Sequence, residues 1–427
     1  MLTSVTFLSF LAGATVVRFQ LWPYPTLWRA FMATEAIDAR LRPAARYGWF
    51  LYGKARREQP GVLRYDPDQA VDGFTVFSSG DSQRVVMVDM AGTIVHQWRK
   101  QHSSIWPDPP HVAGGAPDDE LVTVRRTKLF PNGDLLALYV CQGKTPWGCG
   151  LVKLDRHSRV LWKYPGNTHH DVQLGDDGQI VTLTHEILTE PIPGLPAKLV
   201  PPFVEDFVVL LSEDGEPLKK VGVTAAFLRS PYAAAAEQLR PDLTGDLWHA
   251  NGATPLTRDL APSFPFLAAG QVLLSLRNVG CLAAMDLEQE TIVWARFGPF
   301  RRQHDADFLP NGHILLFDNR GPLVAGPRSR VIEIDPRTMG IAWQFDGTAE
   351  DRLYSRVQGS QQRLRGGNTL ITESQGGRIL EVTANGEVVW EYSSPFRAPQ
   401  DPQKVGIVQR AERIERDAVA FELEPPR

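Results

Sequence analysis

The feature that most constrains the fold of this chain is a recurring strand end, in which an aspartate is followed after a similar short interval by a tryptophan. Four copies keep both residues: Asp89 to Trp98, Asp155 to Trp162, Asp286 to Trp294, and Asp335 to Trp343. A fifth copy ends at Trp390 with Thr383 in place of the aspartate, and a unit at residues 210–223 keeps an Asp-Gly turn but has no tryptophan. These six imperfect repeats predict an array of similar units, with each tryptophan packed between neighbours.

From the second unit onward, each repeat also has an upstream element that reads as a strand, a tight turn and an apolar strand. Several of these turns are Asn-Gly or Asp-Gly, which suit two-residue hairpins because both residues can adopt positive φ. Successive turns lie 45 residues apart from Gly133 to Gly178 and 42 residues apart from Gly270 to Gly312. Such spacing is typical of four-stranded propeller blades.

The sequence therefore predicts an all-β fold, a six-bladed β-propeller over residues 71–397, followed by a C-terminal tail at residues 398–427. The 92 residues between Gly178 and Gly270 leave room for one insertion, which includes a predicted helical stretch rich in alanine at residues 224–240.

Ahead of the repeats, residues 1–17 carry no charged side chain. This apolar run predicts an N-terminal membrane or signal helix, and we assign residues 1–22 to a signal anchor or a cleaved signal peptide. Residues 23–70 are predicted to form a helical linker. We expect a membrane-anchored chain with its propeller on the periplasmic side of a bacterial inner membrane, although the eight basic residues within 18–57 favour the opposite orientation.

Charge and cysteine content narrow the function classes. The formal net charge of −4 argues against nucleic-acid binding. The three cysteines are too few for a disulfide scaffold and lack the CxxC spacing of a zinc site. Cys141 and Cys149 bracket a Gly/Pro loop, so they either form a disulfide in an oxidising compartment or are two unrelated buried thiols.

Histidines recur at one position of the repeat. Counting back eight residues from the turn glycine gives His304 before Gly312 and His170 before Gly178. The first strand of a propeller blade lines the central channel, so residues at this position should converge from different blades.

The unit between those two histidines supplies further polar residues, His249 and Asn251 in LWHANGATPL and Arg277 in LLSLRNVG. Three histidines could bind zinc, but a fixed arginine charge beside a dication is unfavourable. We therefore expect neither a metal nor a cofactor.

Several of these stretches resemble the bacterial arylsulfate sulfotransferases. The likeness is carried by QHDADFLPNGHILLFDNRG at 303–321, by WHANGATPL and LLSLRNVG, and by THHDVQLGDDGQI. It spans roughly residues 72–395, and the family is six-bladed. The resemblance implies transfer of a sulfuryl group from a phenolic sulfate ester to a phenolic acceptor, without a nucleotide sulfate donor.

The resemblance also implies roles for individual residues. His304 would be the sulfated nucleophile, His249, Asn251 and Arg277 would bind the sulfuryl oxygens, and His170 would move a proton at the phenol oxygen. His169 and Asn319, which lie in the same motifs, are assigned to substrate binding, and the choice between His169 and His170 stays open. A neutral imidazole is a competent nucleophile near neutral pH.

Two other functions remain compatible with the repeats. The strand ends resemble the tryptophan-docking repeats of quinone-cofactor propellers, although those usually have eight blades. A membrane-attached propeller could also bind a partner without catalysis, because one fold hosts many functions. The sequence does not indicate an oligomeric state.

Overall fold

The computed structural model describes residues 50–425, apart from residue 198 and residues 240–244, 321–325 and 349–350, together with positions 9, 13, 15 and 16. The chain divides into residues 1–48 and 49–427, and the fold below belongs to the second unit. The predicted signal segment 1–22 and most of the predicted linker 23–70 lie outside the described residues. Within the described residues, none of the helices has both the length and the apolar character needed to cross a bilayer.

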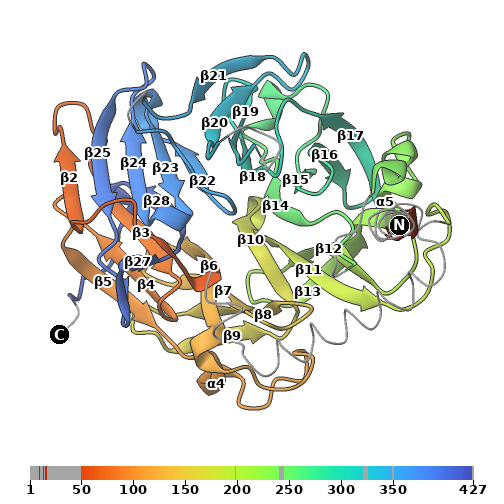
Figure 1. Cartoon of the computed structure of the whole chain (residues 1–427), viewed down its shortest axis with the longest axis horizontal. Helices are drawn as coiled ribbons and strands as arrows, with labels where there is room; N and C mark the ends of the chain where they lie inside the picture. Colours follow the sequence, from red (N-terminus) through yellow and green to blue (C-terminus); the bar gives the residue numbers. More distant parts are fainter. Residues whose placement is uncertain are drawn as a thin grey trace, which may run out of the picture. The chain divides into compact units, whose positions relative to one another are not determined.

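The all-β prediction is confirmed, since the described chain forms seven antiparallel sheets (Figure 1). The first three sheets are β28 (Val408–Ile414), β3 (Phe74–Ser79), β4 (Arg84–Val88) and β5 (Ile94–Arg99); β6 (Val122–Leu129), β7 (Leu135–Cys141), β8 (Gly148–Leu154) and β9 (Val160–Tyr164); and β10 (Thr168–Leu174), β11 (Ile180–Leu188), β12 (Phe203–Leu211) and β13 (Pro217–Gly222).

The next three sheets are β14 (Ala250–Pro255), β15 (Val272–Leu276), β16 (Cys281–Asp286) and β17 (Thr291–Phe297); β18 (His304–Phe308), β19 (Ile314–Asp318), β20 (Arg330–Ile334) and β21 (Ile341–Phe345); and β22 (Ser360–Arg363), β23 (Thr369–Glu373), β24 (Arg378–Val382), β25 (Val388–Ser393) and β2 (Gly61–Tyr65). The seventh sheet consists of β1 (Tyr52–Lys54), β27 (Asp401–Gly406) and β26 (Arg397–Ala398).

Between residues 52 and 425, the described part of the chain has few and short helices. The α-helices there are α4 (His102–Ile105) and α5 (Val223–Leu228), and the 3-10 turns are η1 (Asp119–Leu121), η2 (Asp176–Gly178), η3 (Ala233–Gln238), η4 (Ala261–Ser263), η5 (Arg365–Gly367), η6 (Ser374–Gly376) and η7 (Arg416–Ala418). The helix predicted for residues 224–240 corresponds to α5 and η3, whose alanines pack onto the third sheet and its neighbour.

The edge strands β6, β10, β14, β18, β22 and β28 position the site, because each contacts the next in this series and β28 contacts β6. Apolar side chains fill the space between neighbouring sheets. Leu136 and Leu138 of the second sheet, for example, share one buried cluster with Val209 and Leu211 of the third. Burial of this kind is the main favourable contribution to folding.

Both ends of the predicted propeller range need correction. Residues 398–427 are not a separate tail, because β28 pairs with β3 and completes the first sheet. Within its described part, the predicted helical linker is helical only at Phe50 and Leu51, since residues 52–54 and 61–65 are strands and β2 pairs with β25. The physical reason is strand pairing: unpaired backbone groups at a sheet edge are satisfied by distant segments of the chain.

The repeated tryptophans pack between sheets, as predicted. The indole nitrogens of Trp98, Trp162, Trp343 and Trp390 each donate a hydrogen bond to a turn carbonyl of the following sheet, at Gly133, Glu213, Ala384 and Met90 respectively. The last of these joins the sixth sheet to the first. Each of these tryptophans thus packs its apolar ring between sheets and satisfies its indole N–H with a hydrogen bond.

Candidate active site

Five of the edge strands lose their regular pairing part-way along. The register shifts lie between Val124 and Arg126 in β6, His169 and Val172 in β10, Ala250 and Ala253 in β14, His304 and Asp307 in β18, and Val408 and Ala411 in β28. A β-bulge adds an unpaired residue, re-aims the neighbouring side chains and is common beside active sites. The predicted site residues His170, Asn251 and His304 lie in or at the edge of these bulges.

Backbone strain accompanies the bulges. His170, His249 and Asp305 have φ values of 56°, 52° and 55°, in the left-handed region that residues other than glycine rarely adopt. Strain of this kind persists where surrounding contacts overdetermine the backbone, and it clusters at functional sites.

His304 is held in one tautomer. Its Nδ1 lies 2.7 Å from Asn319 Oδ1 and 3.0 Å from the carbonyl oxygen of Arg302. The Asn319 amide nitrogen donates to the carbonyls of Ser355 and Gln358, which fixes its oxygen toward the imidazole. Both groups facing Nδ1 are acceptors, so Nδ1 carries the proton and Nε2 keeps its lone pair.

The surroundings also keep His304 uncharged. Burial lowers its pKa well below 6.5, and the nearby charges of Arg277 and Arg125 lower the pKa further. A buried neutral imidazole with a lone pair at Nε2 is suited to nucleophilic attack.

A pH prediction follows from this low pKa. Protonation of Nε2 removes its lone pair, so the neutral imidazole should persist as the pH falls through 6.5 and be lost only at more acidic pH. The nitrogen chemical shifts of the His304 ring, followed by NMR from acid to neutral pH, test this. A titration midpoint above pH 6.5 would contradict the lowered pKa.

His249 has a different partner. Its Nδ1 hydrogen-bonds the carboxylate of Asp246, which is 1% exposed, and its backbone N–H donates to the same carboxylate. The backbone N–H of Arg277 donates to the carbonyl of His249, which places the predicted arginine beside this histidine. A carboxylate stabilises a positive imidazole more strongly than a neutral amide does, and at His304 burial and the arginine charges outweigh the hydrogen bond with Asn319, so the two histidines are suited to different roles.

His169 and His170 are neighbours in the chain and contact each other through their rings. Their Nδ1 atoms lie 2.8 Å apart, so one of the two rings carries its proton at Nδ1 and donates it to the other. His169 Nε2 lies 3.3 Å from Asp206 Oδ1, without a hydrogen bond between them. Burial lowers the pKa of His170 well below 6.5, with the histidines nearby acting in the same direction.

The same region satisfies the distance requirement for a metal ion, because ligand atoms of His169, His185 and Asp206 lie within 4.8 Å of one another. Protein groups already engage two of the three residues. His185 Nε2 accepts the N–H of Gly148 at 3.0 Å, and Asp206 Oδ2 accepts the N–H of Ala250 at 2.7 Å. His169 Nε2 and His185 Nδ1 have no hydrogen-bond partner among the described residues, so the cluster keeps atoms that could bind a metal ion.

The two predicted asparagines have structural partners. Asn251 donates to the carbonyl of Gln303, directly before His304, and so ties β14 to the start of β18. The assignment of Asn319 to substrate binding needs correction, because its oxygen and its amide nitrogen are both engaged within the protein. Asn319 orients His304.

A buried cluster of ion pairs involves the residues that directly follow His170 and His304. Arg126 of β6 bonds to Asp171 Oδ1 at 2.8 Å and to Asp305 Oδ1 at 2.8 Å, the residues that follow His170 and His304. Arg410 of β28 also reaches Asp305, at 2.5 Å. This cluster thus joins strands of four sheets and fixes the backbone next to His170 and His304.

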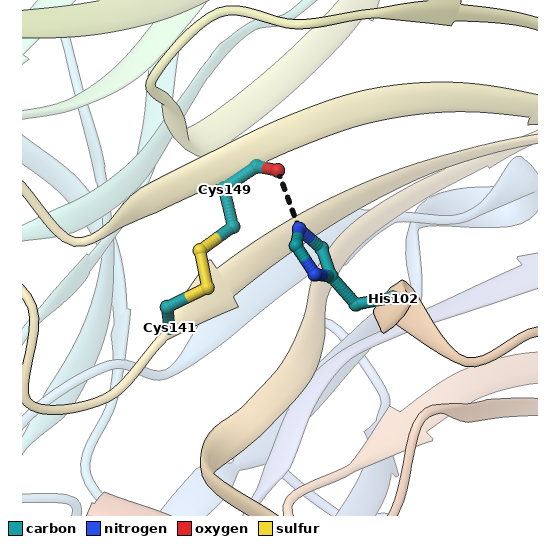
Figure 2. Close-up of side chains that lie close together, drawn as sticks. All are labelled: His102, Cys141 and Cys149. Carbon is teal, nitrogen blue, oxygen red and sulfur yellow. Dashed lines mark hydrogen bonds between the residues drawn. A yellow bond between two sulfur atoms is a disulfide. The ribbon is translucent and has the colours of Figure 1, made fainter. Parts of the chain in front are cut away.

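Of the two alternatives left open for Cys141 and Cys149, the structure has the disulfide, with a Cα–Cα distance of 5.8 Å. Figure 2 shows this bond beside His102, whose Nε2 lies 3.0 Å from the carbonyl oxygen of Cys149. Because both sulfurs are in the disulfide, this group does not offer thiolate ligands. The closed loop carries Trp147, whose ring lies 6.2 Å from His170 and 5.7 Å from His249 between centroids.

The sequence interpretation missed four residues of this site: Arg125, Trp147, Asp206 and Asp246. Arg125 was within reach, because it lies eight residues before the turn glycine Gly133, the same interval that identified His170 and His304. The two aspartates had no such signal, since their partners are set by the packing of strands.

The sequence of this chain matches a known protein family. The family model described as arylsulfotransferase (ASST) matches residues 126–395, which include all seven predicted site residues. The chain belongs to the arylsulfotransferase family. A search of curated proteins found no match to this arylsulfotransferase chain.

Solved structures similar to this arylsulfotransferase chain are distant. A protein of unknown function from Bacteroides caccae has 13% identity and a TM-score of 0.48, covering 80% of this chain and 98% of its own. Virginiamycin B lyase from Staphylococcus aureus has 10% identity and a TM-score of 0.42, covering 81% and 88%. The WD40 β-propeller domain of Doa1 has 9% identity and a TM-score of 0.40, covering 76% and 80%.

Proposed function

We propose that this protein transfers a sulfuryl group from a phenolic sulfate ester to a phenolic acceptor through a sulfohistidine at His304. The observation that carries the proposal is the state of His304, a buried and neutral imidazole whose Nδ1–H is held by Asn319. Its Nε2 lone pair lies among groups suited to an anionic ester, the guanidinium of Arg277 and the Asp246-backed imidazole of His249. Membership of the arylsulfotransferase family supports this class of reaction.

In the first half-reaction, Nε2 of His304 attacks the sulfur and forms an N–S bond. The bond between sulfur and the phenolic oxygen breaks, and its electron pair leaves with the phenolate. In the second half-reaction, the oxygen of the acceptor phenol attacks the same sulfur, the N–S bond breaks, and the lone pair returns to His304. Catalysis of such a loose transfer consists mainly of positioning and of stabilising charge on the peripheral oxygens.

In this proposal His249 binds the sulfuryl group, and His170 acts on the acceptor phenol. Asp246 allows His249 to bear a proton, so it can donate a hydrogen bond to a sulfuryl oxygen alongside Arg277. His170 is neutral at neutral pH, because burial lowers its pKa, and it therefore acts as the base that takes the proton of the acceptor phenol. This revises the expectation that His170 also protonates the leaving oxygen.

We also propose the architecture and location that accompany this function. The six sheets of four or five strands are the six blades, and the series of contacts from β6 to β28 supports their closure. The Cys141–Cys149 disulfide supports an oxidising compartment outside the cytoplasm. Anchoring at the periplasmic face of an inner membrane is part of the same proposal.

Intact mass of the full chain after exposure to 4-nitrophenyl sulfate tests the proposed function. We expect the mass to rise by one sulfuryl group and to return to its original value when phenol is added. The unchanged mass of protein exposed to 4-nitrophenol alone serves as the control. If the donor gives neither a covalent adduct nor transfer to phenol, the proposed function is wrong.

Trp147 is expected to bind the aromatic ring of the donor, because it is partly exposed and stands edge-on to His170. Replacing Trp147 with alanine should raise KM for 4-nitrophenyl sulfate about tenfold with a smaller change in kcat, the size of one aromatic contact. Trp147→Phe should retain most of the affinity, and reduction of the disulfide should mimic Trp147→Ala. Equal KM values for the wild type and Trp147→Ala would contradict this role.

A further inference from the structure

Arg125 occupies the same position in its sheet as His170 and His304 do in theirs. It is the bulged residue of β6, eight residues before Gly133, as His170 and His304 precede Gly178 and Gly312. Its neighbour Arg126 bonds to both aspartates that follow those histidines. Arg125 therefore lies at the position of β6 that corresponds to those of His170 in β10 and His304 in β18.

The side chain of Arg125 is not neutralised in the way that its neighbours are. Arg126 and Arg410 both bond to carboxylates, whereas Arg125 donates from Nη1 to the neutral amide oxygen of Gln409 at 2.7 Å. Burial and the adjacent Arg126 lower the pKa of Arg125 to about 10, which still leaves the guanidinium charged at neutral pH.

The strand that carries Arg125 packs against the strand that carries His170, because β6 contacts β10. Arg277 is tied to His249 instead, since its backbone N–H donates to the carbonyl of His249. In keeping with these positions, the charge of Arg125 lowers the pKa of both His170 and His304, and the charge of Arg277 lowers the pKa of His304.

We propose that Arg125 binds the phenolic oxygen of the donor and stabilises the negative charge that develops there as the S–O bond breaks. This proposal rests on the proposed sulfuryl transfer, and it identifies the residue that stabilises the negative charge on the leaving group. Phenolate formation needs such a group, because His170, on the adjacent strand β10, is unprotonated at neutral pH. A cation aimed at an oxyanion stabilises the transition state more than the ground state.

The test compares Arg125→Gln with the wild type over aryl sulfates of graded leaving-group pKa, from 4-nitrophenyl sulfate to phenyl sulfate. We expect kcat/KM of Arg125→Gln to fall about tenfold with the nitrophenyl donor and about 10²–10³-fold with the phenyl donor, because the poorer leaving group carries more charge. Arg125→Lys should recover part of the loss with phenyl sulfate. Arg277→Gln should lose a similar factor with every donor.

Two controls separate charge from structure. Gln409→Ala removes the one amide contact of Arg125 but keeps its charge, so it should leave the dependence on leaving group unchanged. Arg159→Gln, on an exposed turn, should behave as wild type. A uniform loss across all donors in Arg125→Gln, or the same steepened dependence in Gln409→Ala, would overturn the proposal. Absence of transfer by the wild type would instead overturn the proposed function.

Discussion

Replacing His304 with alanine should reduce sulfuryl transfer from 4-nitrophenyl sulfate to phenol by at least about 10⁴-fold, because the variant has no nucleophile to carry the group. The loss should appear in both half-reactions, as the missing burst of 4-nitrophenol and as the missing mass of one sulfuryl group. Added imidazole should restore a small part of the burst, since it can occupy the vacated volume and supply the lost nitrogen.

The matched control for this variant is His313→Ala. His313 lies in the turn of the same sheet, where its Nδ1 is 2.7 Å from a carboxylate oxygen of Glu333. We expect near-normal transfer from it. If His304→Ala retained the covalent adduct, another residue would be the nucleophile, and mapping the modified peptide would identify it.

Replacing Arg126 with methionine should lower the free energy of unfolding by about 3–5 kcal/mol, because it leaves the buried carboxylates of Asp171 and Asp305 without their shared partner. The side chains of all three residues are at most 6% exposed, so water does not screen the loss. Urea unfolding followed by tryptophan fluorescence measures the change. Activity should fall as well, since the two aspartates follow His170 and His304 directly.

Arg159→Met is the control for this second prediction. Arg159 also bonds to an aspartate, Asp155, but its side chain is 76% exposed, and the expected loss is below about 1 kcal/mol. Converting Asp171 to asparagine in the Arg126→Met background should recover part of the stability, because it removes a buried charge that has lost its partner, whereas Asp305 keeps Arg410. A loss below about 1 kcal/mol in Arg126→Met would show that the cluster does not hold the sheets together.

Much of the fold could be predicted from the sequence because repeats leave local signals. Alternating strands, Gly-containing turns and tryptophans recur in each unit, and each signal depends on residues close in the chain. The strands at the two ends carried no repeat signal, since β2 and β28 each pair with a segment more than 300 residues away in the sequence. The chain before residue 50 lies largely outside the described residues, so the signal anchor stays a prediction.

Short-range periodicity along the chain was enough to predict the all-β class, the inter-sheet tryptophans and the shared position of His170 and His304. The partners of each histidine became known from the folded chain alone. Asn319 holds His304, Asp246 faces His249, and His169 contacts His170. The reason is physical: the proton position and charge of an imidazole depend on burial and on partners brought together by β-bulges and strand packing, and neither leaves a pattern along the chain.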